Sequence, residues 1–213
     1  MTTIKLFVPY DERVQVEKLG AIHNKGYNYF VSDDLDINLF SRWNKPKLPT
    51  QIVGEDRTLG KNLLYVDLTP ESSWHTNVRS NVSAVDWERI KYMCKERADY
   101  KCELCGTKPN YSQKLYLECH ERFLFDPKTH KQKLARFVCM CTLCHQVTHY
   151  GLSIIQGRED IVFAHLQKIN HWTAKRTQEH INNRWALWEE KNTIDWIIDL
   201  SLLDEIGITS EAE

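Results

Sequence analysis

The pattern of apolar and polar residues begins with a small mixed unit over residues 1–48. Short β-prone apolar runs occupy 3–8 and 27–31. Between and after them, apolar residues recur at near-helical spacing over 11–21 and 36–43. This alternation predicts a βαβα unit at the start of the chain.

A linker follows this unit. Residues 44–62 contain two prolines and two glycines among many polar residues, a composition that is typical of a connecting segment. The run KNLLYVDLT at 61–69 is apolar and β-prone, and it predicts an isolated strand. We therefore assign residues 49–73 to a linker and strand.

The middle of the chain predicts a helix followed by a β-hairpin. Residues 83–98 place Val85, Ile90 and Met93 on one helical stripe. Two β-prone runs at 114–126 and 132–140 are joined by a short loop with Asp and Pro, which favours a hairpin.

A short helix then ends at Gly151, and helical periodicity dominates from Glu159 to about Leu203, including the stretch 194–206. We assign 74–151 to one domain and 152–213 to a helical extension. The fold class that we predict is α+β.

Charge and cysteine content narrow the function. The net charge is −1, but the middle third is basic and contains all seven cysteines, between Cys94 and Cys144. The first residues contain no apolar signal-peptide core, and no apolar run is long enough to cross a membrane, so we expect a cytoplasmic protein without a membrane partner. In a reducing compartment, clustered cysteines favour metal binding over disulfides.

Two C-x-x-C pairs carry the clearest chemical signal. Cys102 and Cys105 precede the predicted hairpin, and Cys141 and Cys144 follow it. Each pair brings two thiolates to one side of a tight turn, and two such turns complete a tetrahedral Zn²⁺ site. We therefore predict a structural zinc held by these four residues. The remaining cysteines, Cys94, Cys119 and Cys139, are expected to be small core residues.

Three histidines converge on the same segment. His145 and His149 are four residues apart, so they share one face of a helix. His120 lies in the first strand of the hairpin, against which that helix is expected to pack. This arrangement predicts a second metal site, distinct from the zinc. His130, His165, His171 and His180 are expected to be surface or hydrogen-bonded residues.

The segments CELCG (102–106), LECHERFLFD (117–126) and LARFVCMCTLCHQVTHYG (134–151) together resemble the HNH endonuclease family. TNVRSNVSAVDWERI (76–90) resembles a segment that accompanies a bacterial and phage branch of it. The resemblance covers about 74–151 and implies a ββα-metal core stabilised by zinc. Residues 3–44 resemble a short bacterial domain of unknown function. A phage, prophage or bacterial defence setting is implied.

The resemblance also implies the chemistry. Family members hydrolyse DNA with a histidine-activated water and a single divalent ion, leaving 5′-phosphate and 3′-hydroxyl ends. His145 and His149 match the ion ligands, and the ion would be Mg²⁺, Mn²⁺ or Ni²⁺. Two registers stay open at the strand: His120 is the base, or His120 is a ligand and Glu121 takes the base position. Arg136 falls where the family has an asparagine.

The resemblance makes DNA the expected partner, in double-stranded form. Basic residues on or near the hairpin suit phosphate contact, and we select Arg122, Lys131, Lys133 and Arg136 for that role. The alternative is a zinc-stabilised nucleic-acid-binding or scaffold protein without catalysis. The N-terminal unit or the helical tail could bind a protein partner.

Overall fold

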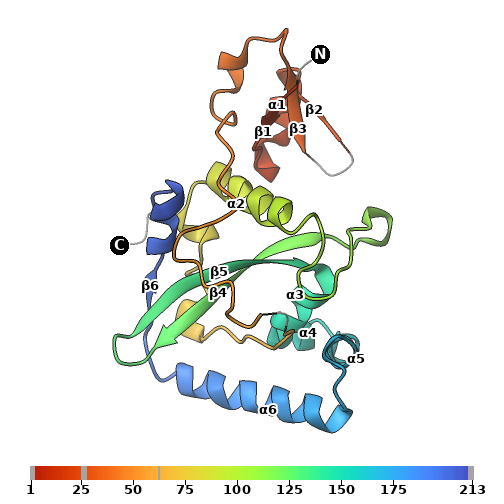
Figure 1. Ribbon diagram of the computed structural model, residues 1–213, viewed down its shortest axis with the longest axis vertical. Helices are drawn as coiled ribbons and strands as arrows, with labels where there is room; N and C mark the ends of the chain where they lie inside the picture. The colour runs from red at the N-terminus through yellow and green to blue at the C-terminus, as the bar shows by residue number, and fades with distance from the viewer. Residues whose placement is uncertain (1–2, 25–27, 62, 211–213) are drawn as a thin grey trace.

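The computed structural model describes residues 3–24, 28–61 and 63–210. In this part of the chain, helices surround two three-stranded sheets, ordered β1-β3-β2 and β4-β5-β6 (Figure 1). The α+β class is confirmed. The N-terminal sheet lies at one end of the molecule, and the long hairpin β4–β5 runs through the middle of the rest.

The N-terminal unit matches the predicted order of elements. It contains β1 (Thr3–Leu6), η1 (Tyr10–Glu12), α1 (Arg13–Lys18), β2 (Ile22–His23), β3 (Tyr29–Ser32) and η2 (Ile37–Phe40). Both strand pairs are antiparallel. The predicted second helix is a short 3-10 helix, and residue 27 of the predicted strand lies outside the described residues. The unit packs on α2 (Ala84–Arg97), where the rings of Phe7 and Tyr92 meet edge to face at 5.7 Å.

Helix α2 confirms the prediction for 83–98. The Ser83 hydroxyl accepts a hydrogen bond from the Asp86 backbone N–H at 3.1 Å, which satisfies one of the free donors at the helix start. Ile90, Met93 and Cys94 are fully buried on the stripe that faces the hairpin. The short helices η3 (Glu71–Ser73) and η4 (Arg79–Asn81) precede α2, and η5 (Tyr111–Gln113) follows it.

The hairpin is the element that positions the site. Strands β4 (Leu117–Asp126) and β5 (Lys131–Cys141) pair antiparallel, from Leu117 opposite Cys141 to Asp126 opposite Lys131. A β-bulge between Arg122 and Phe123 shifts the register. Strand β4 is an edge of its sheet. The predicted hairpin is confirmed.

The strand predicted over 61–69 is wrong, since residues 61 and 63–69 pair with no other strand. Residue 62 lies outside the described residues. Side chains of the C-terminal helices satisfy its backbone instead. Asn170 accepts from the Leu64 N–H and donates to the Leu64 carbonyl, and His180 Nε2 accepts from the Val66 N–H. Its alternating apolar side chains are buried as in a strand, and only the backbone partners differ from the prediction.

The helix after the second cysteine pair does not end at Gly151. Helix α3 (Thr142–Thr148) ends at His149, whose backbone leaves the helical region, and α4 (Tyr150–Ile155) begins at once. Gly151 lies inside α4, where it packs close to the Trp185 ring. The break at His149 redirects the chain without separating it from His145, because the His149 N–H still donates to the His145 carbonyl at 3.0 Å.

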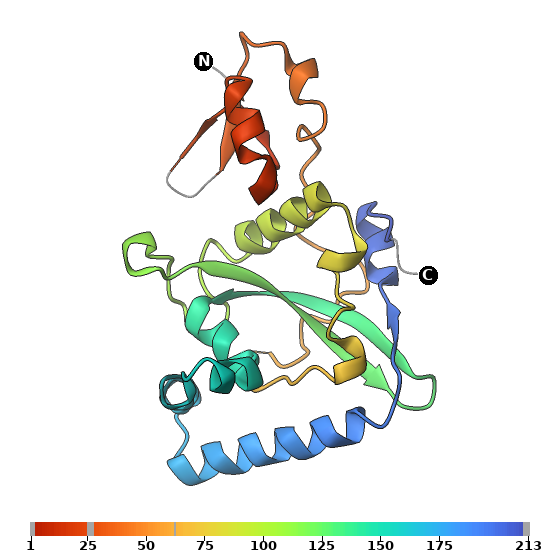
Figure 2. The same ribbon diagram turned by 180° about the vertical axis from the view of Figure 1, so that it is seen from behind.

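The C-terminal extension is helical only in part. Helices α5 (Glu159–Asn170) and α6 (Ala174–Lys191) are as predicted, but 194–206 does not form the predicted α-helix. Residues Ile197–Asp199 form β6, parallel to β5, and η6 (Ser201–Ile206) follows. The chain returns along the hairpin from the end of α6 (Figure 2). Trp196 packs edge-on against Phe125 at 4.9 Å, which favours the extended return over another helix. Among the described helices, none has the length and apolar character needed to span a membrane.

Candidate metal centres

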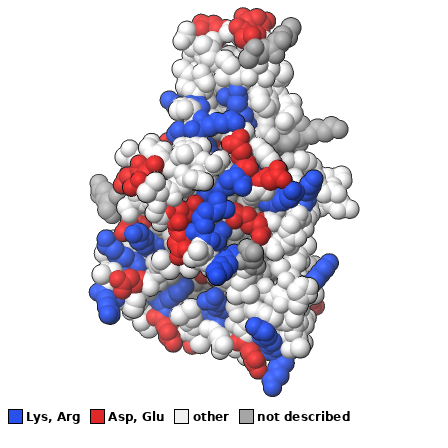
Figure 3. Space-filling view, in the orientation of Figure 1, with Lys and Arg blue, Asp and Glu red and all other residues white. Residues whose placement is uncertain are grey.

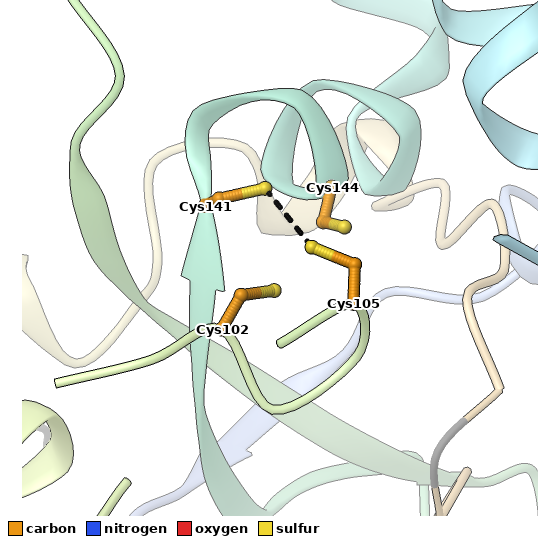
Figure 4. A group of neighbouring side chains, drawn as sticks. All are labelled: Cys102, Cys105, Cys141 and Cys144. Atoms are coloured by element: carbon orange, nitrogen blue, oxygen red, sulfur yellow. Dashed lines mark hydrogen bonds between the residues drawn. The ribbon is translucent and has the colours of Figure 1, made fainter. Parts of the chain in front are cut away.

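The four predicted zinc ligands meet at one point (Figure 4). Cys102 and Cys105 lie on the loop after α2, Cys141 ends β5, and Cys144 lies in the first turn of α3. Their sulfur atoms all lie within 4.8 Å of one another, and the sulfurs of Cys105 and Cys141 are 3.6 Å apart. Four thiolates at about 2.3 Å from a tetrahedral zinc stand about 3.8 Å apart. The group could therefore hold a metal ion such as zinc.

The local backbone prepares this arrangement. Gly106 has φ +72°, and its N–H donates to the Cys102 carbonyl at 2.9 Å, which closes the turn of the first pair. Hydrogen bonds from Cys102, Cys141 and Cys144 lower the pKa of Cys105 far below its usual value. The same contacts raise the pKa of Cys141 and Cys144, because neighbouring thiols cannot all ionise without a cation between them. Since metal binding requires thiolates, a bound cation would let all four ionise.

One residue beside the cysteines was missed in the sequence. The Nε2 atom of His165, in α5, lies 3.2 Å from the Cys144 sulfur. We had expected His165 to be a surface or hydrogen-bonded residue, and its contact is with a candidate ligand. No local spacing reveals it, because α3 and α5 come together only in the folded chain.

The three other cysteines are core residues, as predicted. Cys94, Cys119 and Cys139 are buried, and Cys119 lies opposite Cys139 across the hairpin. They belong to the layer between α2 and the hairpin, in the same core cluster as the four-cysteine group.

The three predicted histidines also converge. His120 comes from the middle of β4, His145 from α3, and His149 from the end of α3. One ring nitrogen from each lies within 4.8 Å of the others, and the ring centroids are 4.6 to 5.4 Å apart. The group therefore has the side chains and spacing of a metal site.

His120 is the most informative member of this group. Its side chain is 5% exposed, and within the described structure neither ring nitrogen has a hydrogen-bond partner. Burial, together with His149 and His145, lowers the pKa of His120 well below its usual value. Burial also lowers the pKa of His149, to about 4. Neutral imidazoles with unused nitrogens are costly to bury but are ready metal ligands.

A carboxylate orients the third histidine. Glu118, two residues before His120 on the same face of β4, has Oε2 at 2.9 Å from Nδ1 of His145. Although burial opposes it, the hydrogen bond from His145 lowers the pKa of Glu118. Since Nδ1 is engaged, Nε2 is the nitrogen of His145 that is left for an ion.

Glu121 follows His120 in β4, the edge strand of its sheet. Burial raises the pKa of its carboxyl group, and backbone N–H groups of Val78 and Arg79 partly offset this effect. Glu121 and the three histidines line one cavity of about 1020 Å³. A carboxylate that binds a proton more readily than usual therefore lines the cavity that contains the candidate metal group.

Two of the four predicted phosphate-binding residues are in the wrong place for that role. Arg122 is fully buried: it stacks on the Tyr65 ring at 4.1 Å and donates to the carbonyls of Leu59 and Leu63. Gly60, with φ +67°, allows this approach, since a side chain there would collide with the guanidinium.

Arg136 is 2% exposed and donates to the carbonyls of Arg57 and Leu59 and to Glu103. Both arginines therefore anchor the linker to the hairpin and present no surface to a phosphate. Lys133 is exposed, and Lys131 is exposed with Nζ 3.4 Å from Asp199.

Comparisons of the chain with family models, with curated proteins and with solved structures returned no match. The chemistry of the site has to be argued from its own geometry.

Proposed function

We propose that the protein is a metal-dependent endonuclease of the HNH type that hydrolyses phosphodiester bonds in DNA. One observation carries the proposal: a buried His120, without hydrogen-bond partners among the described residues, meets His145 and His149 in a cavity that Glu121, a carboxylate of raised pKa, also lines. His120 and Glu121 on the strand lie in the segment 117–126, and His145 and His149 on the helix lie in the segment 134–151. Both segments resemble this family.

The geometry favours one of the two registers. His120 closes the histidine group, so we assign it as a ligand together with His145 and His149. Glu121 then occupies the base position, where it would accept the proton of the attacking water. Because its pKa is raised, the carboxylate of Glu121 is a stronger base than an ordinary glutamate.

The group of His120, His145 and His149 fits a divalent ion, because both ring nitrogens of the buried His120 lack a hydrogen-bond partner among the described residues. A bound ion supplies Lewis-acid stabilisation of the charge that develops on the phosphate. Three nitrogen ligands suit a transition ion such as Mn²⁺ or Ni²⁺ better than Mg²⁺. Glu118 fixes the ring of His145.

The four-cysteine group has a structural role in this proposal. Zinc there would tie the loop after α2 to the start of α3, the helix that contributes two of the three histidines. Its binding energy would be part of the folding energy of this region.

A second candidate is a zinc-stabilised nucleic-acid-binding or scaffold protein without catalysis. It is favoured by Arg136, which falls roughly where the family has an asparagine and whose two terminal nitrogens bind the linker and Glu103. No amide at that position orients a base in this chain.

Cleavage of supercoiled plasmid and of circular single-stranded DNA tests the proposal. Purified protein would be assayed with Mg²⁺, Mn²⁺, Ni²⁺ or EDTA, with His120→Ala alongside and Lys18→Ala, an exposed residue of the N-terminal unit, as the control. Metal-dependent cleavage that His120→Ala abolishes and Lys18→Ala preserves is the expected result. Absence of cleavage on both DNAs by folded, zinc-loaded protein would favour the second candidate.

A further inference from the structure

The cavity that contains the histidines is more than a metal pocket. It extends between α2 on one side and α4 and α6 on the other, and residues 73–79 lie along it. Much of its lining is apolar and aromatic, contributed by Trp74, Trp87, Leu152, Ile155, Trp185 and Trp188. A site that only had to bind a phosphate and an ion would not need this apolar area.

Three indoles form an ordered wall of this cavity. The Nε1–H groups of Trp74 and Trp188 both donate to the Thr69 carbonyl, at 3.0 and 2.9 Å. Trp185 packs edge-on against Trp188 at 5.3 Å and close to Gly151 of α4. Trp74 is nevertheless 57% exposed. Because its polar atom is already satisfied, the exposed part of Trp74 is an aromatic surface held in a fixed orientation.

Cations line the other side of the cavity. Lys91 and Lys95 belong to α2, and Arg79 belongs to the segment before it. Lys91 is paired with Glu88 at 2.5 Å, whereas no ion pair among the described residues involves Arg79 or Lys95. Aromatic rings on one wall and cations on the other match an unpaired nucleotide, whose base has π faces and whose phosphate is anionic.

The face drawn in Figure 3 gives little support to a long duplex footprint. Arg122 and Arg136 are buried, and basic and acidic side chains are interspersed over the middle of the face in Figure 3. A duplex presents phosphates outward and hides the faces of its bases in the stack, so it could not fill an apolar aromatic wall without extruding a base.

We propose that Trp74, Trp185 and Trp188 form a nucleobase subsite, and that the DNA substrate is unpaired at the nucleotide beside the scissile phosphate. The inference rests on the proposed nuclease for its chemistry, and it replaces the double-stranded substrate that the resemblance implied. Single-stranded DNA satisfies the subsite directly.

Binding of short fluorescein-labelled oligonucleotides tests the subsite without catalysis. Fluorescence anisotropy would compare an oligothymidylate, a duplex of the same length and an oligouridylate, using zinc-loaded protein without other divalent ions. We expect the oligothymidylate to bind about tenfold or more tightly than the duplex. Trp74→Ala should weaken its binding by about tenfold, since stacking on an aromatic ring contributes on this scale.

Matched variants separate stacking from general damage. Trp74→Phe should retain most of the affinity, and Tyr10→Ala, an exposed aromatic of the N-terminal unit, should change nothing. Ile155→Glu, at an 84% exposed position of the cavity lining, should weaken binding by repelling the phosphates without disturbing the core.

The outcomes distinguish this inference from the nuclease proposal. Equal affinity for duplex and oligothymidylate, or unchanged affinity in Trp74→Ala, overturns the subsite. Tighter binding of the oligouridylate overturns DNA as its ligand. Trp74-dependent binding without cleavage upholds the subsite and overturns the nuclease. Metal-dependent cleavage at equal rates on duplex and single strand, unaffected by Trp74→Ala, upholds the nuclease and overturns the subsite.

Discussion

The Nδ1 atom of His145 lies 2.9 Å from Oε2 of Glu118. The two residues come from α3 and β4, and the contact fixes the ring that shares a group with His120 and His149. Carboxylates that hold a histidine in this way are typical of metal sites, where they set the tautomer and raise the basicity of the ligand. Through this contact Glu118 belongs to the proposed centre, although Glu118 is not itself a proposed ligand.

Replacing Glu118 should therefore weaken the histidine site alone. We expect Glu118→Gln to lower the affinity for Ni²⁺ or Mn²⁺ about tenfold to a hundredfold, because the ring of His145 is no longer fixed by a charged partner. Calorimetric titration of zinc-loaded protein measures this affinity, and Glu205→Gln, on the exposed side of η6, is the control. Unchanged affinity in Glu118→Gln would remove the carboxylate from the centre.

The cysteine assignment predicts a difference between two classes of thiol. Cys105→Ser should reduce the zinc content per chain and lower the thermal midpoint, since one of four ligands is lost. Cys94→Ala, in the core between α2 and the hairpin, should keep its zinc and lose only packing energy. Metal analysis of both purified variants makes the comparison. Equal zinc content in the two would contradict the assignment.

The burial of Arg122 predicts an effect on stability that an exposed basic residue does not have. Arg122→Met removes the side-chain donor of the Leu63 carbonyl, one of the two arginine donors of the Leu59 carbonyl, and the guanidinium that stacks on Tyr65. We expect a loss of about 2 kcal/mol in the free energy of unfolding. Lys133→Met, on the exposed surface of the hairpin, should change it by less than about 0.5 kcal/mol. Urea denaturation compares the two, and similar losses would contradict the structural role of Arg122.

The lowered pKa of His149 predicts a pH-dependent stability. Its pKa is about 4 in the folded protein and about 6.5 in an unfolded chain, so the unfolded state takes up the proton first as the pH falls. The free energy of unfolding therefore holds its full value, as far as His149 is concerned, above pH 6.5 and decreases as the pH falls towards 4.

Between pH 7 and pH 5 the wild type should therefore lose about 2 kcal/mol more than His149→Gln. Urea denaturation at both pH values, without divalent ions other than zinc, measures the difference. The same variant controls for acid effects elsewhere, including the cysteine group. Parallel losses in the two proteins would mean that His149 is not buried in its neutral form.

Local patterns in the sequence predict the elements that residues close together in the chain determine. The hairpin, α2 and both C-x-x-C turns follow from strand-forming runs, the Ser83 cap and the cysteine spacing. His145 and His149 follow from helical spacing, and their meeting with His120 follows from the short connection between β5 and α3.

Features that depend on distant parts of the chain were not predictable. Residues 194–206 have a helical pattern, yet pairing with β5 and the packing of Trp196 on Phe125 extend part of them as β6. Arg122 looks like a surface cation because the linker that covers it lies some 60 residues earlier in the sequence. The partner of His165 is equally remote.

The roles of two adjacent residues, His120 as a ligand and Glu121 as the base, are the central claim of this account. Single-turnover cleavage by Glu121→Gln, measured together with its affinity for the divalent ion, tests the claim most directly. We expect cleavage to slow by about a hundredfold or more while ion affinity is unchanged, and His120→Ala to lose the ion itself. Wild-type cleavage by Glu121→Gln, or full ion affinity in His120→Ala, would contradict the assignment.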